Sequence, residues 1–194
     1  GDLWIGSQIR KEVARCDLDT GLIDDGLSHT EVALKACEEI GMSDLAVSVK
    51  AVRSRLLLAA GRTQEALAVA AEAAGNTQRG IESAHLVPFA HGLALSAAGR
   101  SMEADRYLEL AHDQLLLLLG DLPVSDREVA LRVVPTHREV VEAWERRRPR
   151  RSEQRLARRE APTGRPLAAD EWVQVTWTVW APADDEVRDP VERR

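Results

Sequence analysis

The sequence predicts a mainly α-helical protein with a small β appendage at its C-terminus. Up to about residue 144, Ala, Leu, Glu and Arg dominate and apolar residues recur three and four positions apart, which is the spacing of a helix face. A ten-residue segment recurs at an offset of 38 residues. The stretch 172–180 consists almost wholly of β-branched and aromatic residues, which favour a strand. We therefore expect a helical repeat domain at 1–144, an Arg/Pro-rich linker with at most one strand at 145–170, and a strand with a charged tail at 171–194.

Glycines and capping residues divide the helical region. Three segments match the S/T-x-x-E capping box and should start helices at Ser28, Ser125 and Thr136. Glycine ends helices readily because it adopts the left-handed conformation without strain, and the predicted stops are Gly41, Gly61, Gly75, Gly99 and Gly120. Pro88 falls inside the fifth helix, which should kink there or begin near it. The predicted helices are 2–16, 29–40, 43–60, 63–74, 80–98, 101–119, 125–133 and 136–148.

The recurring segment indicates a helical hairpin. Leu57 to Ala66 (LLAAGRTQEA) and Leu95 to Ala104 (LSAAGRSMEA) share seven of ten residues. In each copy a helix should end at the glycine and a second should begin at the following Thr or Ser, with small residues where the helices cross. Such a hairpin buries its apolar faces only by stacking on another, so we expect a stacked array.

Over residues 28–120 this pattern resembles the tetratricopeptide repeat (TPR) family. The family's small, apolar, Gly and Ala positions are occupied in the two copies by Ser54, Leu57, Gly61, Ala66, Ala70 and Ala73, and by Gly92, Leu95, Gly99, Ala104, Leu108 and Ala111. Ala33 and Cys37 suit the second helix of an earlier, degenerate copy. Lys50 or Pro88 stands where the family has an aromatic residue, and the period is 38 residues rather than about 34. The resemblance implies a helical-hairpin solenoid that binds a protein or peptide.

The segments after the repeats resemble the C-terminal part of large bacterial TPR-containing transcriptional regulators. The similar segments are 121–144 and 164–182. This second resemblance implies that the chain is the sensor or assembly part of such a regulator. The chain starts without Met, and we expect further residues before Gly1 and after Arg194.

No catalytic, cofactor or metal residue is predicted. The sequence contains no GxxxxGK[ST], GxGxxG, HExxH or GxSxG motif, and the spacing of His85 and His91 is not that of a metal pair on one helix face. The first helices of the hairpins should line the binding groove of a solenoid. The candidate groove residues are Lys50, Arg53, Ser54, Pro88, His91 and Leu95.

A basic segment supports an alternative function. The chain carries a net charge of -6, yet Arg146 to Glu160 holds eight arginines and two glutamates. This belt, from Arg146 to Arg159, makes a nucleic-acid-contacting module the alternative, with Arg147, Arg150 and Arg151 as candidate phosphate contacts. The belt has no interleaved aromatic residues and the rest of the chain is acidic, so we do not expect the fragment alone to bind nucleic acid.

Two apolar features are candidates for self-association. The run Leu115 to Leu119 is apolar most of the way round a helix, which favours core packing, with self-association as the alternative. Trp144 and the strand tryptophans should anchor packing or an interface rather than stack on a ligand. An isolated strand needs a partner, so we expect a homodimer through this run or through the strand face Val173, Val175, Trp177 and Val179.

The remaining expectations concern environment. The chain has no apolar run long enough to cross a bilayer and no signal-type start, so no membrane role and a cytoplasmic location are expected. Cys16 and Cys37 lack any metal-binding or disulfide pattern, and both are expected to be reduced and buried.

Overall fold

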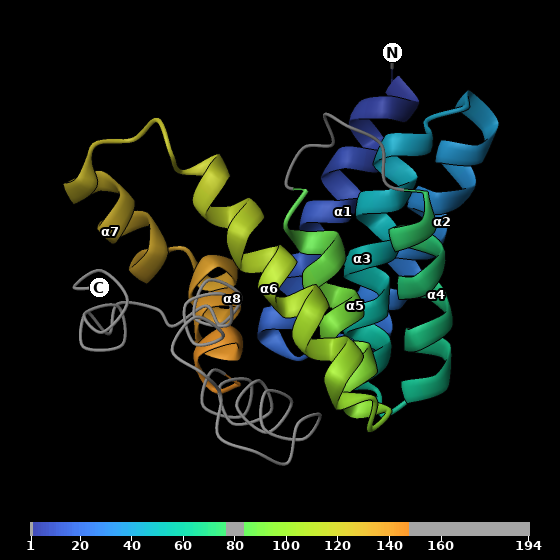
Figure 1. Ribbon diagram of the computed structural model, residues 1–194. Coiled ribbons are helices and arrows are strands. Elements are labelled where there is room, and N and C mark those ends of the chain that lie inside the picture. The colour runs from blue at the N-terminus through green and yellow to red at the C-terminus, as the bar shows by residue number, and fades with distance from the viewer. Residues whose placement is uncertain (1, 77–83, 148–194) are drawn as a thin grey trace, which may run out of the picture. The chain divides into compact units, whose positions relative to one another are not determined.

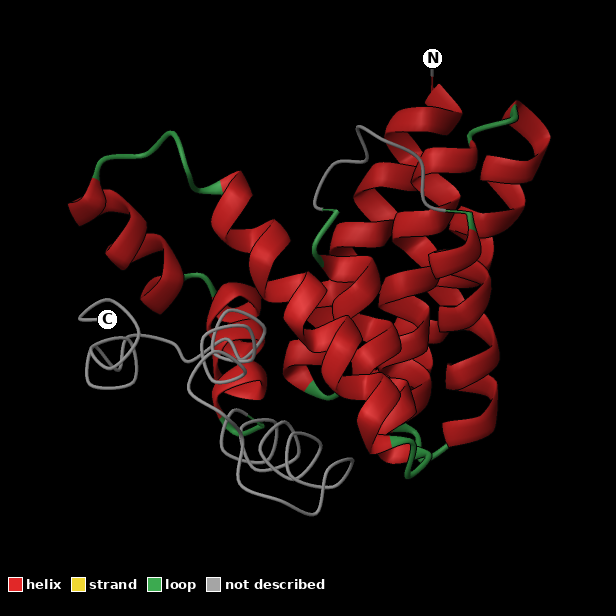
Figure 2. Cartoon of the chain, viewed as in Figure 1, coloured by secondary structure: helices red, strands yellow, loops and turns green. Residues whose placement is uncertain are grey.

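The computed structural model describes residues 2–76 and 84–147, and every regular element in those ranges is an α-helix (Figures 1 and 2). The mainly α-helical prediction is therefore confirmed. The predicted linker, from residue 148 onward, and the strand at 172–180 lie outside the described residues, and Glu145 at the expected start of the linker is the last residue of α8. The hairpins lie within one compact unit, Gly1–Trp144. The helices are α1 (Asp2–Thr20), α2 (Ile23–Ile40), α3 (Ser43–Ala59), α4 (Thr63–Gly75), α5 (Leu86–Ala97), α6 (Ser101–Leu118), α7 (Val124–Val133) and α8 (Pro135–Glu145).

Most predicted helix ends are close to the observed ones, but the first junction differs. α1 continues to Thr20 and α2 begins at Ile23, so Ser28 lies inside α2 and its predicted capping box is wrong. Ser125 also lies inside its helix, which begins one residue earlier and has no side-chain cap. Thr136 is the second residue of α8 and is buried. Pro88 lies in the first turn of α5, where the missing N–H is tolerated, so the helix begins near it as predicted.

Four helix junctions share one backbone conformation. Gly21, Gly41, Gly61 and Gly99 all have φ between 68° and 81°. In each turn the residue after the glycine donates its N–H to the carbonyl five residues earlier, as Arg62 does to Leu57 at 2.8 Å. These two-bond turns are Schellman motifs, which satisfy the last carbonyls of one helix and reverse the chain. The residue after the glycine is also the N-cap of the next helix, so the antiparallel helices follow one another directly.

Small residues five positions after three of these glycines let the paired helices approach closely. Ala66 and Ala104 are completely buried. The corresponding residue in the first pair is Gly26, where an added Cβ would lie 3.2 Å from the Asp17 Cβ of α1 and 2.7 Å from a methyl carbon of Leu56 of α3. The Ser54 hydroxyl donates to the Ala66 carbonyl at 2.9 Å, which joins α3 to α4 at the crossing.

Three hairpins are built in the same register. The pairs α1/α2, α3/α4 and α5/α6 each contact internally, and the first helices α1, α3 and α5 contact in succession. Offsets of 40 and 38 residues relate the equivalent buried positions Ala14, Ser54 and Gly92 on these first helices. Residues 21–33 and 61–73 have the same order of buried, half-buried and exposed side chains. The pair α1/α2 is therefore a third hairpin of the same kind.

The two helices after the hairpins differ in how they pack. α7 contains no fully buried residue. α8 buries one face, with Val140 and Ala143 packed against Leu108, Leu115 and other residues of α5 and α6. Within the leucine run, Leu115 and Leu119 are buried, whereas the side chains of Leu116, Leu117 and Leu118 are exposed. The core prediction thus holds for one side of this run.

The close crossing of α3 and α4 gives a stability test. Ala66→Leu should lower the free energy of unfolding by about 1–3 kcal/mol, because the added carbons have no space at the crossing. Ala68→Leu, two residues away on the less buried side of α4, should leave it nearly unchanged, since Leu and Ala have similar helix propensities. Urea unfolding of both variants checks this; equal midpoints would contradict the close crossing.

Candidate functional site

α8 lies against a helix from each of the three hairpins. The Arg15 guanidinium of α1 donates to the Thr136 hydroxyl at 3.4 Å. Arg55 of α3 forms an ion pair with Glu139. On α5, Phe89 belongs to the core cluster that holds Val140. α8 therefore bridges helices that are far apart in the sequence.

Three residues on the side of the hairpins where α8 lies occupy one repeated position. Arg15 and Arg55 are 40 residues apart, and Leu93 follows Arg55 by 38, so the three are equivalent in the three hairpins. Leu93 is half-buried and packs against the same cluster as Val140. We call Arg15, Arg55, His85, Phe89 and Leu93 the α8-binding face. From α8, the buried residues Thr136, Val140, Ala143 and Trp144 form one helix stripe.

Arg55 is the central charged group of this face. Its side chain is only 15% exposed, and the guanidinium carbon lies 5.4 Å from the centre of the Phe89 ring. Burial lowers the pKa of Arg55, while the charges of Glu139 and Asp19 oppose that shift and Arg15 adds to it. Because a largely enclosed cation loses much of its hydration, the Glu139 carboxylate compensates for part of that cost.

Two imidazole rings meet where α8 approaches the start of α5. The rings of His85 and His137 are 5.4 Å apart and arranged edge to face. His85 is 3% exposed, and its Nδ1 has no hydrogen-bond partner. Burial, with the nearby His137 and Arg15, lowers the pKa of His85 to about 4. Burial also lowers the pKa of His137, although a hydrogen bond to the Ala130 carbonyl opposes the shift. The docked α8 thus favours neutral imidazoles.

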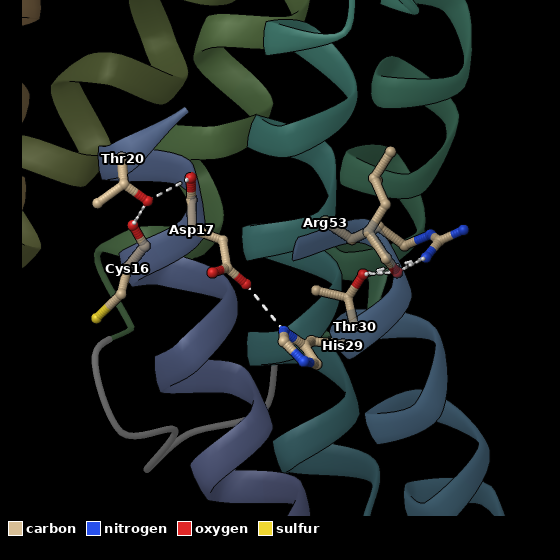
Figure 3. Close-up of polar contacts among 7 residues, drawn as sticks. Cys16, Asp17, Thr20, His29, Thr30 and Arg53 are labelled. Atoms are coloured by element: carbon tan, nitrogen blue, oxygen red, sulfur yellow. Dashed lines mark hydrogen bonds and ion pairs between the residues drawn. The ribbon is translucent and has the colours of Figure 1, made fainter. Parts of the chain in front are cut away.

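A second polar cluster joins the first three helices (Figure 3). Asp17 stands where the other hairpins have Leu57 and Leu95, and its carboxylate contacts His29 Nδ1 at 2.8 Å. Cys16 takes part through its carbonyl, which accepts from Thr20 at 2.8 Å, and its sulfur points away from His29. The cluster connects helices rather than presenting a nucleophile to a base.

The predicted groove residues do not gather at the α8-binding face. Ser54, Pro88 and Leu95 are buried in the helix packing and offer no surface to a partner. His91 is also buried, with its ring 4.2 Å from that of Tyr107. Lys50, by contrast, is half-buried and forms an ion pair with Glu72.

Arg53 likewise joins helices. It donates to the Leu27 carbonyl at 3.0 Å and to the Thr30 hydroxyl at 3.1 Å (Figure 3). Arg15 and Arg55, which contact α8, were not among the predicted groove residues, and the binding groove itself stays a prediction. Their 40-residue offset was the available signal.

Other predicted residues have mixed outcomes. Cys37 is buried as expected, but Cys16 is exposed, so its predicted burial is wrong. Trp144 packs as predicted and stacks on the His112 ring at 4.1 Å. Arg147 is half-buried. The phosphate candidates Arg150 and Arg151 and the dimer candidates Val173, Val175, Trp177 and Val179 lie outside the described residues and stay predictions.

We also searched the described residues for a metal site, a membrane-spanning helix and a pocket. Within 2–76 and 84–147, no three His, Cys, Asp or Glu side chains are grouped so that they could hold a metal ion. No helix in these ranges combines the length and apolar character needed to cross a membrane. A pocket of about 220 Å³ lies beside His29, lined by Gly6, Ile9, Arg10 and Val13.

No family model, curated protein or solved structure matches the chain.

The histidine contact predicts acid sensitivity. In the unfolded chain His85 binds a proton below about pH 6.5, whereas in the folded chain it stays neutral down to about pH 4. The unfolded state therefore takes up more protons, and its uptake lowers the free energy of unfolding as the pH falls through this interval. Between pH 7 and 5, the free energy of unfolding should fall by about 2 kcal/mol less in His85→Gln than in the wild-type chain. Urea midpoints at both pH values check this, and the same loss in both proteins would contradict it.

Proposed function

We propose that this chain is a non-catalytic protein–protein interaction module, a TPR-like helical-hairpin solenoid whose first-helix face holds a helix. The observation that carries the proposal is the occupied α8-binding face. Arg15 and Arg55, equivalent positions on two hairpins, contact one amphipathic helix, and Leu93, their equivalent on the third, packs against the cluster that includes Val140 of that helix. A face that accepts a helix of its own chain has the chemistry to accept one from a partner.

The wider role that we propose is the sensor or assembly part of a larger, cytoplasmic bacterial transcriptional regulator, acting as a homodimer. The support for this role comes from the sequence: the resemblance of the segments after the repeats, and the apolar strand face that needs a partner. In such a role the module binds a partner protein and signals this binding to the rest of the regulator, without catalysing a reaction.

Peptide selection tests the interaction function without assuming a partner. Displayed random peptides are selected on the full chain, and the affinities of the winners are measured for variants. Arg15→Ala should weaken them about tenfold, the value of one charge-assisted hydrogen bond. Arg62→Ala is the matched control, because Arg62 is exposed and pairs with Glu65 in a turn. Peptides that are selected readily but are insensitive to Arg15→Ala would contradict the proposed face.

The alternative, a nucleic-acid-contacting module, is favoured by one observation, the eight arginines between Arg146 and Arg159. The remaining chain is acidic and opposes the approach of phosphate. We expect a labelled DNA duplex to bind weakly or not at all near physiological salt. Any binding through the belt should fall steeply as salt rises, because phosphate contacts release counterions. Anisotropy titrations at several salt concentrations measure this. Sequence-specific binding at nanomolar protein would promote the alternative.

A further inference from the structure

The contacts of α8 are ones that a separate helix can also make. Thr136, Glu139, Val140 and Ala143 meet the other helices, and they follow the spacing i, i+3, i+4 and i+7. This is the spacing with which amphipathic helices insert into a receiving surface. α8 thus binds the face as a short peptide ligand would.

The connection to α8 adds little packing of its own. α7 joins α6 to α8 and has no fully buried residue. From α7, Ala130 and Leu131 reach the core cluster, and both are only partly buried. Val129 and Val133 are exposed. The position of α8 therefore depends mainly on its own contacts with the face.

Charge specifies what else can occupy the face. With a helix on the face, as α8 is now, Arg55 is largely enclosed beside Phe89, with Arg15 adding like charge and Asp19 as a further nearby acid. A replacement without a carboxylate leaves this buried cation undercompensated, which is costly. A replacement with Glu or Asp opposite Arg55 restores the pair, and apolar residues one position and one turn further on fill the places of Val140 and Ala143.

We propose that α8 is a replaceable resident of the α8-binding face, and that the partner is an amphipathic helix with a carboxylate opposite Arg55 that binds by displacing α8. This inference rests on the proposed function and adds the chemistry of the partner and its regulation. The chain is closed while α8 is docked, and open to the partner when α8 is released.

A peptide with the sequence of residues 134–145 serves as the probe. Its affinity is measured for the full wild-type chain and for two full-chain variants that loosen α8. Glu139→Arg places like charge against Arg55, and Val140→Asp puts a charge into the apolar cluster. Hydrogen exchange of α8 reports whether each variant has released it, and thermal unfolding reports that the hairpins stay folded. The control peptide carries Arg in place of Glu139.

The proposal predicts that both variants release α8 and bind the peptide about tenfold or more tightly than the wild-type chain, since a face occupied nine-tenths of the time lowers the apparent affinity by that factor. The control peptide should show no such gain, and should bind a chain that carries Arg55→Glu together with Val140→Asp.

Three results would overturn the inference. If the peptide binds the wild-type and loosened chains alike, with a dependence on Arg55, α8 does not close the face, while the proposed function stands. If α8 is released and no chain binds the peptide, the face does not exchange helices; the selected peptides then decide separately whether it binds proteins. If α8 stays protected in both variants, the contacts of Glu139 and Val140 do not hold it.

Discussion

The left-handed glycine at the end of a helix is the constraint on which the other features depend. At Gly21, Gly61 and Gly99 the positive φ lets two hydrogen bonds close one helix while the next residue starts another. Because the reversal is so short, the partner helix begins at a set rotation, and the small residue five positions later reaches the crossing. The equivalence of Arg15 and Arg55 follows from the same geometry. Two side chains separated by 40 residues face one helix because their hairpins were closed in the same way.

The helices and two of the hairpins could be predicted from the sequence because the signals for them are local. Glycine followed by a capping residue marks a junction, and apolar spacing marks a helix. The first hairpin was predicted only as a degenerate copy, from Ala33 and Cys37 in its second helix, because Asp17 and Thr30 stand where the other copies have apolar residues. In the structure these polar groups find partners in His29 and Arg53, so they are buried without breaking the register. A local pattern cannot show that compensation, since the partners lie on other helices.

The residues that contact α8 could not be predicted from the sequence. A binding face on the first helices was expected, but the residues named for it were mostly those that hold the helices together. Burial of Ser54 and Leu95 depends on how α4 and α6 cross over them, which is a tertiary property. The contacts of α8 with the other helices could not be predicted from the sequence for the same reason. Its sequence predicts an amphipathic helix, and the identity of the surface that it covers is set by α6 together with α1, α3 and α5, which lie further away in the chain.

The short connection through α7 has a consequence for competition. A helix tethered beside its own binding face acts at a high effective concentration, of millimolar order for short flexible linkers. A free rival at ordinary cellular abundance therefore meets a competitor that is always near. The partner helix must either bind the face much more tightly than Thr136, Glu139 and Val140 do, or be held close to it by a second binding site. A tethered helix such as α8 therefore favours partners that bind the chain at two places, and it excludes free helices that bind only the face.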